Sequence, residues 1–235
     1  MSIIKNILEN NDCRRMSTTM SQPPQGIILH SVACAQPDAK VFLRLWNTPG
    51  VEIGVHGIVD GLSGDTYQCL PWDWLGWHAG GPGNLTHIGI EMCEPACIRY
   101  TGQSDQFEVR PDALNDAREV ALRTYKGAVD AFAQICKLYD LDPRKDGVIL
   151  SHSEAGKYGL SHSGHTDPEH LWKGLKMSLT MDTFREDVAL KMFGMPVYRV
   201  QVGAFYNRDY AEAYRQKVIA AGFPDAFIVK EDPDL

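Results

Sequence analysis

Gly26-Ile27-Ile28-Leu29-His30 is an apolar run that ends in a histidine. Runs of this kind form strands that are buried on both faces of an α/β sheet. Residues 86–92 have the same character, and Gly147-Val148-Ile149-Leu150 leads within two residues to His152. We therefore expect an α/β fold with these three strands at its centre.

Two of these histidines stand directly after strand-like segments, in Ile28-Leu29-His30-Ser31 and Leu150-Ser151-His152-Ser153. An aspartate follows in His165-Thr166-Asp167-Pro168. Two imidazoles and one carboxylate form a zinc ligand set that leaves the fourth position open, as in catalytic sites. If His30, His152 and Asp167 converge, we expect a zinc hydrolase that holds one Zn²⁺ per chain.

Apolar spacing and turn residues predict the elements around this core. Pro111 suits the first turn of the longest helix, which should stop near Asp140. Further helices are expected over residues 39–46 and about 183–192, strands over 54–60 and 66–70, and a short helix that packs Ile3, Ile4, Ile7 and Leu8.

The pattern changes after Gly194-Met195-Pro196. Residues 198–204 alternate like a half-buried strand, 207–221 have a helical pattern, and 226–230 return as a strand. One β-α-β unit of about forty residues is near the lower limit for independent folding. We expect a catalytic domain over 1–193, a linker over 194–196 and a small β-α-β domain over 197–235.

Composition excludes several classes of partner. The chain has 235 residues, of which 44% are hydrophobic and 23% charged, with a formal net charge of −7. That charge argues against a nucleic-acid partner, and no apolar run is long enough to cross a bilayer, so no membrane partner is expected. Because the first thirty residues lack the apolar core of a secretory signal, we expect synthesis in the cytoplasm without a signal peptide.

Six cysteines are scattered along the chain, at positions 13, 34, 69, 93, 97 and 136. Without an export signal we expect reduced and mostly buried thiols. Cys93 and Cys97 could hold a metal, but no second ligand pair stands at zinc-finger spacing, which favours a structural role.

Amide hydrolysis at a zinc site needs a proton shuttle and a donor for the developing oxyanion. Glu91 ends a core strand and is the carboxylate that suits the first role. His165, two residues before Asp167, suits the second. The alternative for Glu91 is a structural salt bridge, and for His165 a simple loop position.

Four motifs follow one another along the chain: Ile-Leu-His at 28–30, Gly-Trp-His-Ala-Gly at 76–80, His-Ile-Gly-Ile-Glu at 87–91, and Ser-His-Ser followed by Thr-Asp-Pro. Together they resemble the type 2 N-acetylmuramoyl-L-alanine amidase family. His-Ser-Val at 30–32, Leu-Pro-Trp at 70–72 and Asp-Pro-Glu-His-Leu-Trp at 167–172 are similar to clostridial phage endolysins most of all. The resemblance covers about residues 24–190. It implies a central mixed β-sheet flanked by helices, and cleavage between N-acetylmuramic acid and L-alanine of bacterial peptidoglycan.

The resemblance also implies roles for single residues. His30, His152 and Asp167 would be the zinc ligands, and Glu91 would handle the proton of the attacking water. His165 falls where many members have lysine, and since the charge of histidine depends on pH near neutrality, the pH dependence of the reaction is left open. The groove for the peptide stem would be lined by Trp77, His78 and Asn84, although a structural hydrogen bond is an equal alternative for His78.

The tail is similar to one half of a SPOR-type peptidoglycan-binding repeat. The motifs are Tyr-Arg-Val-Gln-Val-Gly-Ala-Phe at 198–205 and Ala-Ala-Gly-Phe at 220–223. That domain normally contains two β-α-β halves. The second half could come from another chain, so we expect cell-wall binding, homodimer formation through the tail, or both.

Other functions remain open. Some recognition proteins of the family have lost a metal ligand and only bind peptidoglycan, and a zinc peptidase that cuts within the stem would share the metal. A phage or prophage endolysin, released through a pore to reach the wall, is favoured over a host autolysin. His56 is expected to be a packing residue, and His162 and His170 are expected near the surface or at a helix start.

Overall fold

The computed structural model describes residues 1–102, 106–162, 164–194, 201–223 and 226–228. It divides into two compact units, Met1–Gly194 and Met195–Leu235. Of the expected linker at 194–196, residues 195 and 196 lie outside the described ranges, so the linker stays a prediction.

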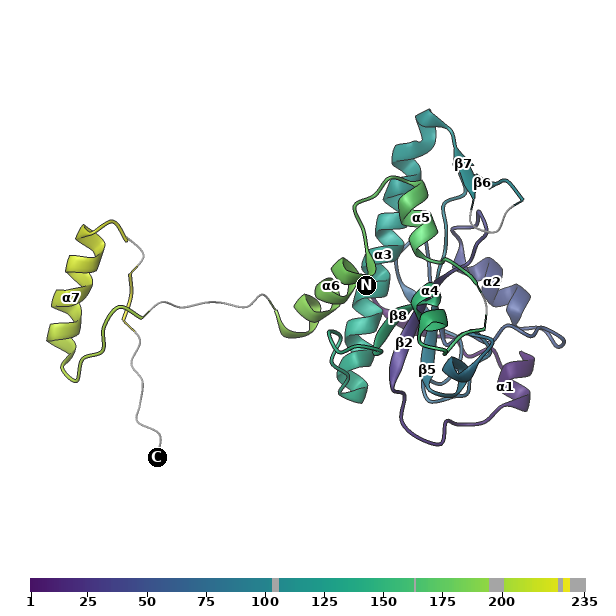
Figure 1. The fold of residues 1–235 in the computed structure, drawn as a ribbon, viewed down its shortest axis with the longest axis horizontal. Helices are drawn as coiled ribbons and strands as arrows, with labels where there is room; N and C mark the ends of the chain where they lie inside the picture. The colour runs from purple at the N-terminus through teal and green to yellow at the C-terminus, as the bar shows by residue number, and fades with distance from the viewer. Residues whose placement is uncertain (103–105, 163, 195–200, 224–225, 229–235) are drawn as a thin grey trace. The chain divides into compact units, whose positions relative to one another are not determined.

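The helices and strands follow one another along the chain as labelled in Figure 1. In the first unit they are β1 (Ile3–Lys5), α1 (Asp12–Met16), β2 (Gly26–Ser31), α2 (Ala39–Trp46), β3 (Gly57–Val59), β4 (Thr66–Gln68), the 3₁₀ turn η1 (Pro82–Leu85), β5 (His87–Met92), β6 (Ile98–Tyr100), β7 (Phe107–Val109), the 3₁₀ turn η2 (Pro111–Ala113), α3 (Leu114–Tyr139), β8 (Ile149–Ser151), α4 (His152–Lys157), α5 (Glu169–Gly174) and α6 (Met181–Phe193). The second unit contains α7 (Arg208–Ala220).

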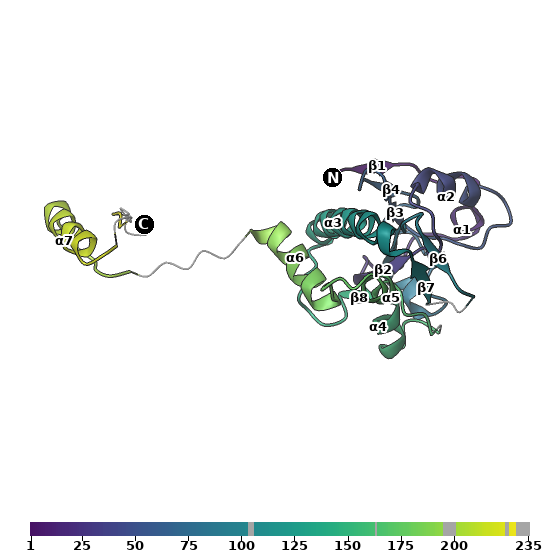
Figure 2. The same cartoon turned by 90° about the horizontal axis from the view of Figure 1, so that it is seen from above.

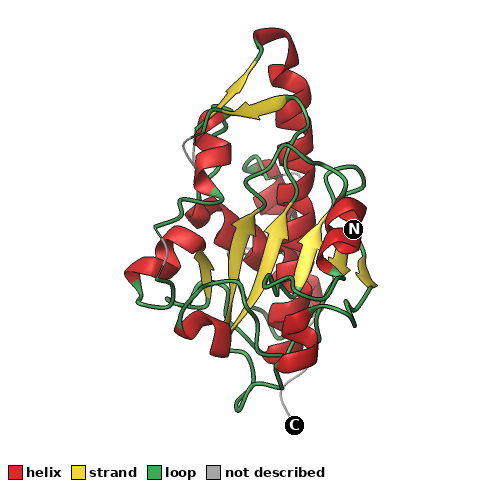
Figure 3. Cartoon of the chain, turned by 90° about the vertical axis from the view of Figure 1, so that its right-hand side faces the viewer, coloured by secondary structure: helices red, strands yellow, loops and turns green. Residues whose placement is uncertain are grey.

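Six strands form one mixed sheet in the order β1-β4-β3-β5-β2-β8. Strand β2 lies between β5 and β8 and is parallel to both, while β3 and β4 pair antiparallel. Figure 3 shows these strands side by side, with the longest helix passing behind them. The predicted α/β class with a mixed sheet and flanking helices is therefore confirmed.

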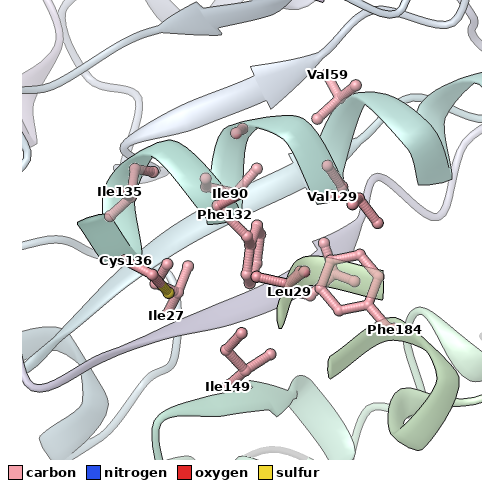
Figure 4. Packing of buried hydrophobic residues seen from close by; sticks show 14 of the residues in the cluster. Ile27, Leu29, Val59, Ile90, Val129, Phe132, Ile135, Cys136, Ile149 and Phe184 are labelled. Atoms are coloured by element: carbon pink, nitrogen blue, oxygen red, sulfur yellow. The ribbon is translucent and has the colours of Figure 1, made fainter. Parts of the chain in front are cut away.

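The main core lies between this sheet and α3. Alternate residues of β2 and β5 point toward the helix, among them Leu29 and Ile90, both fully buried. Phe132 of α3 packs edge to face on Phe184 of α6, with ring centroids 5.0 Å apart, and Figure 4 shows these rings over the strands. This packing stabilises the centre of the sheet from one side.

The other residues of the same strands face the opposite side. Ile28 joins Leu150 and Ala155 of α4 in a separate apolar cluster. In Figure 2, α3 and α4 lie on opposite sides of β2 and β8. His30 alternates with Leu29 and so leaves the sheet on the side of α4, away from the main core.

Several predicted helices are confirmed. Helix α2 has the predicted bounds, because the Asp38 side chain accepts from Lys40 N at its start. The long helix ends before Asp140, which is left-handed with φ 52°. Pro111 begins a 3₁₀ turn that leads into α3, and α6 spans 181–193 instead of 183–192.

Other expectations were wrong in detail. Residues 3–5 form strand β1 rather than a helix, because they pair with β4 as a parallel edge strand. The strands expected over 54–60 and 66–70 shorten to β3 and β4. The β6–β7 hairpin and helices α4 and α5 were not predicted.

The second unit is described mainly by α7, which begins one residue after Asn207, whose side chain accepts from Asp209 N and Tyr210 N. Residues 201–205 and 226–228 belong to no strand, which corrects those parts of the two expected tail strands. Residues 198–200 and 229–230 lie outside the described ranges.

The cysteines are all free in the structure. Cys13, Cys69, Cys93 and Cys136 are buried, whereas Cys34 and Cys97 are exposed. Within the described ranges, no helix has the length and apolar character needed to cross a membrane.

Candidate metal centre

Neighbouring parallel strands deliver two histidines to one end of the sheet. His30 is the fifth residue of β2, and His152 follows the last residue of β8. Ser151 caps α4 by accepting from Glu154 N, and the Glu154 side chain accepts from Ser151 N in return. This capping box makes His152 the first residue of the helix, which fixes where its side chain starts.

Asp167 reaches the same place from the loop before α5. Its backbone oxygen accepts from His152 N at 3.2 Å, and its Oδ2 accepts from Ser31 N at 3.3 Å. Asp167, His30 and His152 are all buried. The loop is thus joined to the ends of both strands, by the backbone oxygen of Asp167 at one and by its side chain at the other.

The three side chains present one ligand atom each to a common point. His30 Nδ1 lies 3.0 Å from His152 Nδ1, Asp167 Oδ2 lies 3.3 Å from His30 Nδ1, and Asp167 Oδ1 lies 3.3 Å from His152 Nδ1. In a tetrahedral zinc site with bonds of about 2.0–2.1 Å, ligand atoms stand about 3.3 Å apart. The donor set and its spacing therefore fit zinc.

The electrostatics of the three groups also suit a cation. Burial opposes ionisation of Asp167, but its close contacts with His152 and His30 outweigh this effect and hold the pKa of this carboxyl below its ordinary value. Burial lowers the pKa of His30, although Asp167 works against the shift. A neutral imidazole beside a carboxylate is the form that binds a metal.

The second ring nitrogen of each histidine ligand also contacts the protein. His152 Nε2 lies 2.9 Å from Ser161 Oγ, and His30 Nε2 lies 3.0 Å from His78 Nδ1. Contacts of this kind set the orientation of metal-binding imidazoles. Neither was predicted, since both depend on residues brought together only by the fold.

Glu91 shares the face of the sheet that carries His30, because the two are register partners on β5 and β2. Burial, followed by the charges of Asp167 and Glu94, raises the pKa of Glu91 well above its ordinary value. Its Oε2 is buried and has no hydrogen-bond partner among the described residues. No salt bridge of Glu91 is present in the described part of the chain, and a catalytic role for Glu91 stays a prediction.

His165 lies at the exposed edge of the same site. Its ring centroid is 4.8 Å from that of His152, and its Nδ1 is 3.7 Å from Asp167 Oδ1. The side chain is 63% exposed. It can therefore meet a substrate that arrives from solvent.

The three residues expected to line the groove lie close together, but they do not all face one pocket. Trp77 and Asn84 line a surface pocket together with His162 and the segment Gly80–Pro82, but His78 is not part of that lining. Asn84 Oδ1 accepts from His78 N at 2.9 Å and from Ala79 N at 2.7 Å. Asn84 thus holds the loop that carries His78, and a substrate role for these residues stays a prediction.

A buried polar cluster near the metal centre was missed from the sequence. Tyr100 Oη lies 2.6 Å from Glu94 Oε2 and 2.8 Å from His170 Nε2. Burial raises the pKa of Glu94 to about 7, although Tyr100 works against the shift. The only sequence signal was Glu94 close behind a core strand, since the β6–β7 hairpin that brings Tyr100 was not predicted.

Comparison with known proteins gives two family matches. The family described as N-acetylmuramoyl-L-alanine amidase matches residues 20–170, and the SPOR domain matches residues 194–234.

Two curated relatives from Bacillus subtilis (strain 168) align over short stretches. CwlH, an N-acetylmuramoyl-L-alanine amidase, is 39% identical over 79 residues, which is 31% of this chain and 31% of that protein. XlyA, of the same description, is 38% identical over 78 residues, 31% of this chain and 26% of that protein. The chain thus spans about a third or less of the length of these relatives.

Solved structures share the fold. The catalytic domain of XlyA has a TM-score of 0.56 at 23% identity and covers 80% of this chain and 99% of that one. The Staphylococcus aureus hydrolase AmiA, solved in complex with its ligand, has a TM-score of 0.55 at 20% identity and covers 82% of this chain and 85% of that one. These likenesses place the six-stranded sheet and its helices in a known architecture.

Proposed function

The chain belongs to the N-acetylmuramoyl-L-alanine amidase family, and from this premise we propose that it hydrolyses the amide bond between N-acetylmuramic acid and L-alanine in bacterial peptidoglycan. The observation that carries the proposal is the convergence of His30, His152 and Asp167 at spacings that suit one Zn²⁺. All three ligands are in place, which favours catalysis over a module that only binds the wall.

The residues of the site have separate tasks in this reaction. Zinc held by the three ligands would supply Lewis-acid chemistry toward water and the amide carbonyl. Glu91 takes a proton from the attacking water while the oxygen of that water bonds to the carbonyl carbon. When the carbon–nitrogen bond breaks, Glu91 returns the proton to the nitrogen of alanine, so that one water is consumed and a free amine and a carboxyl group are formed. His165 donates a hydrogen bond to the carbonyl oxygen as negative charge develops there.

The burial of Glu91 supports its role. A carboxylate with a raised pKa holds a proton more readily than an exposed one, which suits a group that accepts and then returns a proton near neutral pH. Glu91 Oε2 accepts no hydrogen bond from the described residues, so no other donor competes with the water for this oxygen.

The test is digestion of purified cell walls, followed by mass spectrometry of the soluble products. The amidase releases intact stem peptides with L-alanine at the amino end. A peptidase that cuts within the stem would release shorter fragments, and a binding module would release nothing. Either of the last two results from the zinc-loaded protein would refute the proposal.

We also propose that the SPOR domain binds the peptidoglycan on which the first unit acts. In the second unit α7 has no buried residue, and Tyr210 and Tyr214 are exposed on it. A second copy of the tail could cover them, which supports a homodimer. Equilibrium sedimentation that gives a monomer for the full chain would contradict the homodimer. It would not test whether the SPOR domain binds the wall.

The biological setting is proposed as that of a phage or prophage endolysin, made in the cytoplasm and released to the wall through a pore. The segments His-Ser-Val at 30–32, Leu-Pro-Trp at 70–72 and Asp-Pro-Glu-His-Leu-Trp at 167–172, which resemble those of clostridial phage endolysins, support this. Expression together with a membrane pore protein should lyse the host cell, whereas expression alone should not. Lysis without the pore would favour a host autolysin with another export route.

A further inference from the structure

His78 uses both of its ring nitrogens inside the protein. His78 Nε2 lies 3.1 Å from the backbone oxygen of His87, and His78 Nδ1 lies 3.0 Å from His30 Nε2. A carbonyl oxygen only accepts, so His78 Nε2 must donate to it. In a neutral imidazole the other nitrogen then accepts, so His78 Nδ1 takes its hydrogen bond from His30 Nε2–H.

This chain of donors fixes the tautomer of His30. With its proton on Nε2, a neutral His30 carries a lone pair on Nδ1, the atom that faces His152 and Asp167. The order of donors therefore runs one way, from His30 through His78 to the carbonyl of His87.

The fold holds the His78 ring firmly in this position. A Cβ at Gly89 would overlap the His78 ring, so glycine at this point of β5 is what makes room for it. The backbone before the ring is fixed by Asn84, whose Oδ1 accepts from His78 N and Ala79 N. Gly89 N in turn donates to His56 Nδ1 at 2.9 Å, which ties the neighbouring histidine to the same strand.

We propose that His78 is a positioning residue for the metal centre: it accepts the Nε2 proton of His30 and so directs the Nδ1 lone pair of His30 toward the metal. A substrate contact would need a ring nitrogen that is already engaged, and His78 does not line the pocket that Trp77 and Asn84 share. The inference rests on the proposed zinc site and extends it.

Two nearly isosteric variants separate this role from simple packing. Asparagine and leucine both branch at Cγ into two terminal atoms, but only asparagine has an oxygen that can accept from His30. Both variants lose the contact with His87 equally. In the full chain, stripped of metal and titrated with zinc against a chromophoric chelator, His78→Leu should bind zinc about 10–100-fold more weakly than the wild type. His78→Asn should recover most of that loss.

A second readout follows the tautomer itself. Nitrogen-15 NMR of the zinc-free protein should place the proton of His30 on Nε2 in the wild type and in His78→Asn, and divide it between the two nitrogens in His78→Leu. If His78→Leu fails to fold, His78→Gln replaces it, because its longer amide reaches toward the carbonyl of His87 and leaves His30 without an acceptor.

The outcomes are distinct. Equal zinc affinity in the wild type and both variants, or equal losses in both variants, would overturn the role of His78 while leaving the zinc site intact. A wild-type protein that binds no zinc would instead refute the proposed function.

Discussion

His30 and Glu91 are register partners on adjacent parallel strands, β2 and β5. Paired residues on neighbouring strands point to the same face of a sheet, so a metal ligand and a carboxylate leave the sheet side by side. The strand pairing itself sets the distance between the proposed proton shuttle and the metal, and no loop has to be ordered to bring them together.

The Glu91→Gln substitution tests this pairing. It keeps the shape of the side chain and removes the group that accepts a proton, so the rate of stem-peptide release should fall by about 10²–10⁴-fold. Zinc content should stay at one per chain, because Glu91 is not among the three ligands. Wall digestion and elemental analysis of the same samples measure both. An undiminished rate would contradict the role of Glu91.

Zinc binding should raise the melting temperature of the protein only when all three ligands are present. Zinc binds the folded state, so an excess of about 100-fold over its dissociation constant should stabilise the wild type by about 2.7 kcal/mol. Asp167→Ala removes one of the three ligands, and its melting temperature should no longer respond to zinc. Calorimetry at several zinc concentrations checks this. A zinc-dependent rise in melting temperature in Asp167→Ala would place the metal elsewhere.

Glu94 should make the zinc-free protein less stable at higher pH. Burial raises its pKa in the folded state to about 7, above that of the unfolded chain, so the folded state binds more protons between about pH 4.5 and pH 7. The free energy of unfolding should therefore fall as pH rises through that window, by up to about 3 kcal/mol. Urea unfolding at pH 5 and pH 8 measures the change. Glu94→Gln, which has no such titration, should show a smaller one.

Gly127→Ala should destabilise the first unit although alanine favours helices. An added Cβ at this position of α3 would overlap the backbone oxygen of Gly64 and the Val59 side chain. Crowding of this kind costs about 1–3 kcal/mol, which exceeds the gain of about 1 kcal/mol in helix propensity. Thermal unfolding should show a lower melting temperature. Gln134→Ala, at an exposed position of the same helix, is the matched control and should change little.

Removal of residues 195–235 should leave the first unit folded. The compact unit ends at Gly194 and contains the whole sheet and the metal ligands. The truncated chain should keep its melting temperature and its zinc content, while its retention on purified walls in a sedimentation assay should weaken. Loss of zinc on truncation would show that the tail supports the site.

The sequence predicts the centre of the molecule better than its edges. Residues 26–31 could be assigned because a strand buried on both faces is apolar along its whole length. The end of helix α2 could be predicted because the turn residues after Trp46 cannot continue a helix. Strand β1 could not be predicted, since three residues at a sheet edge are defined by their partner β4 rather than by their own pattern.

The same division holds for the site. His30, His152 and Asp167 could be selected because each stands in a short motif, and the structure brings them together. The contact between His78 and His30 could not be predicted, since it joins a loop to a strand 48 residues away in the chain. Tyr100 was missed for a similar reason, because the three-residue strand that carries it has too short a pattern to be recognised.

The loop that carries Asp167 has a further consequence. Asp167 comes from a segment separate from the two strands. A cation bound by His30, His152 and Asp167 would link that segment to the sheet reversibly. Loss of the cation would lower the free energy needed to open the segment around Asp167. The stretch after the exposed Lys157 would then be the first place where a protease distinguishes empty from loaded protein.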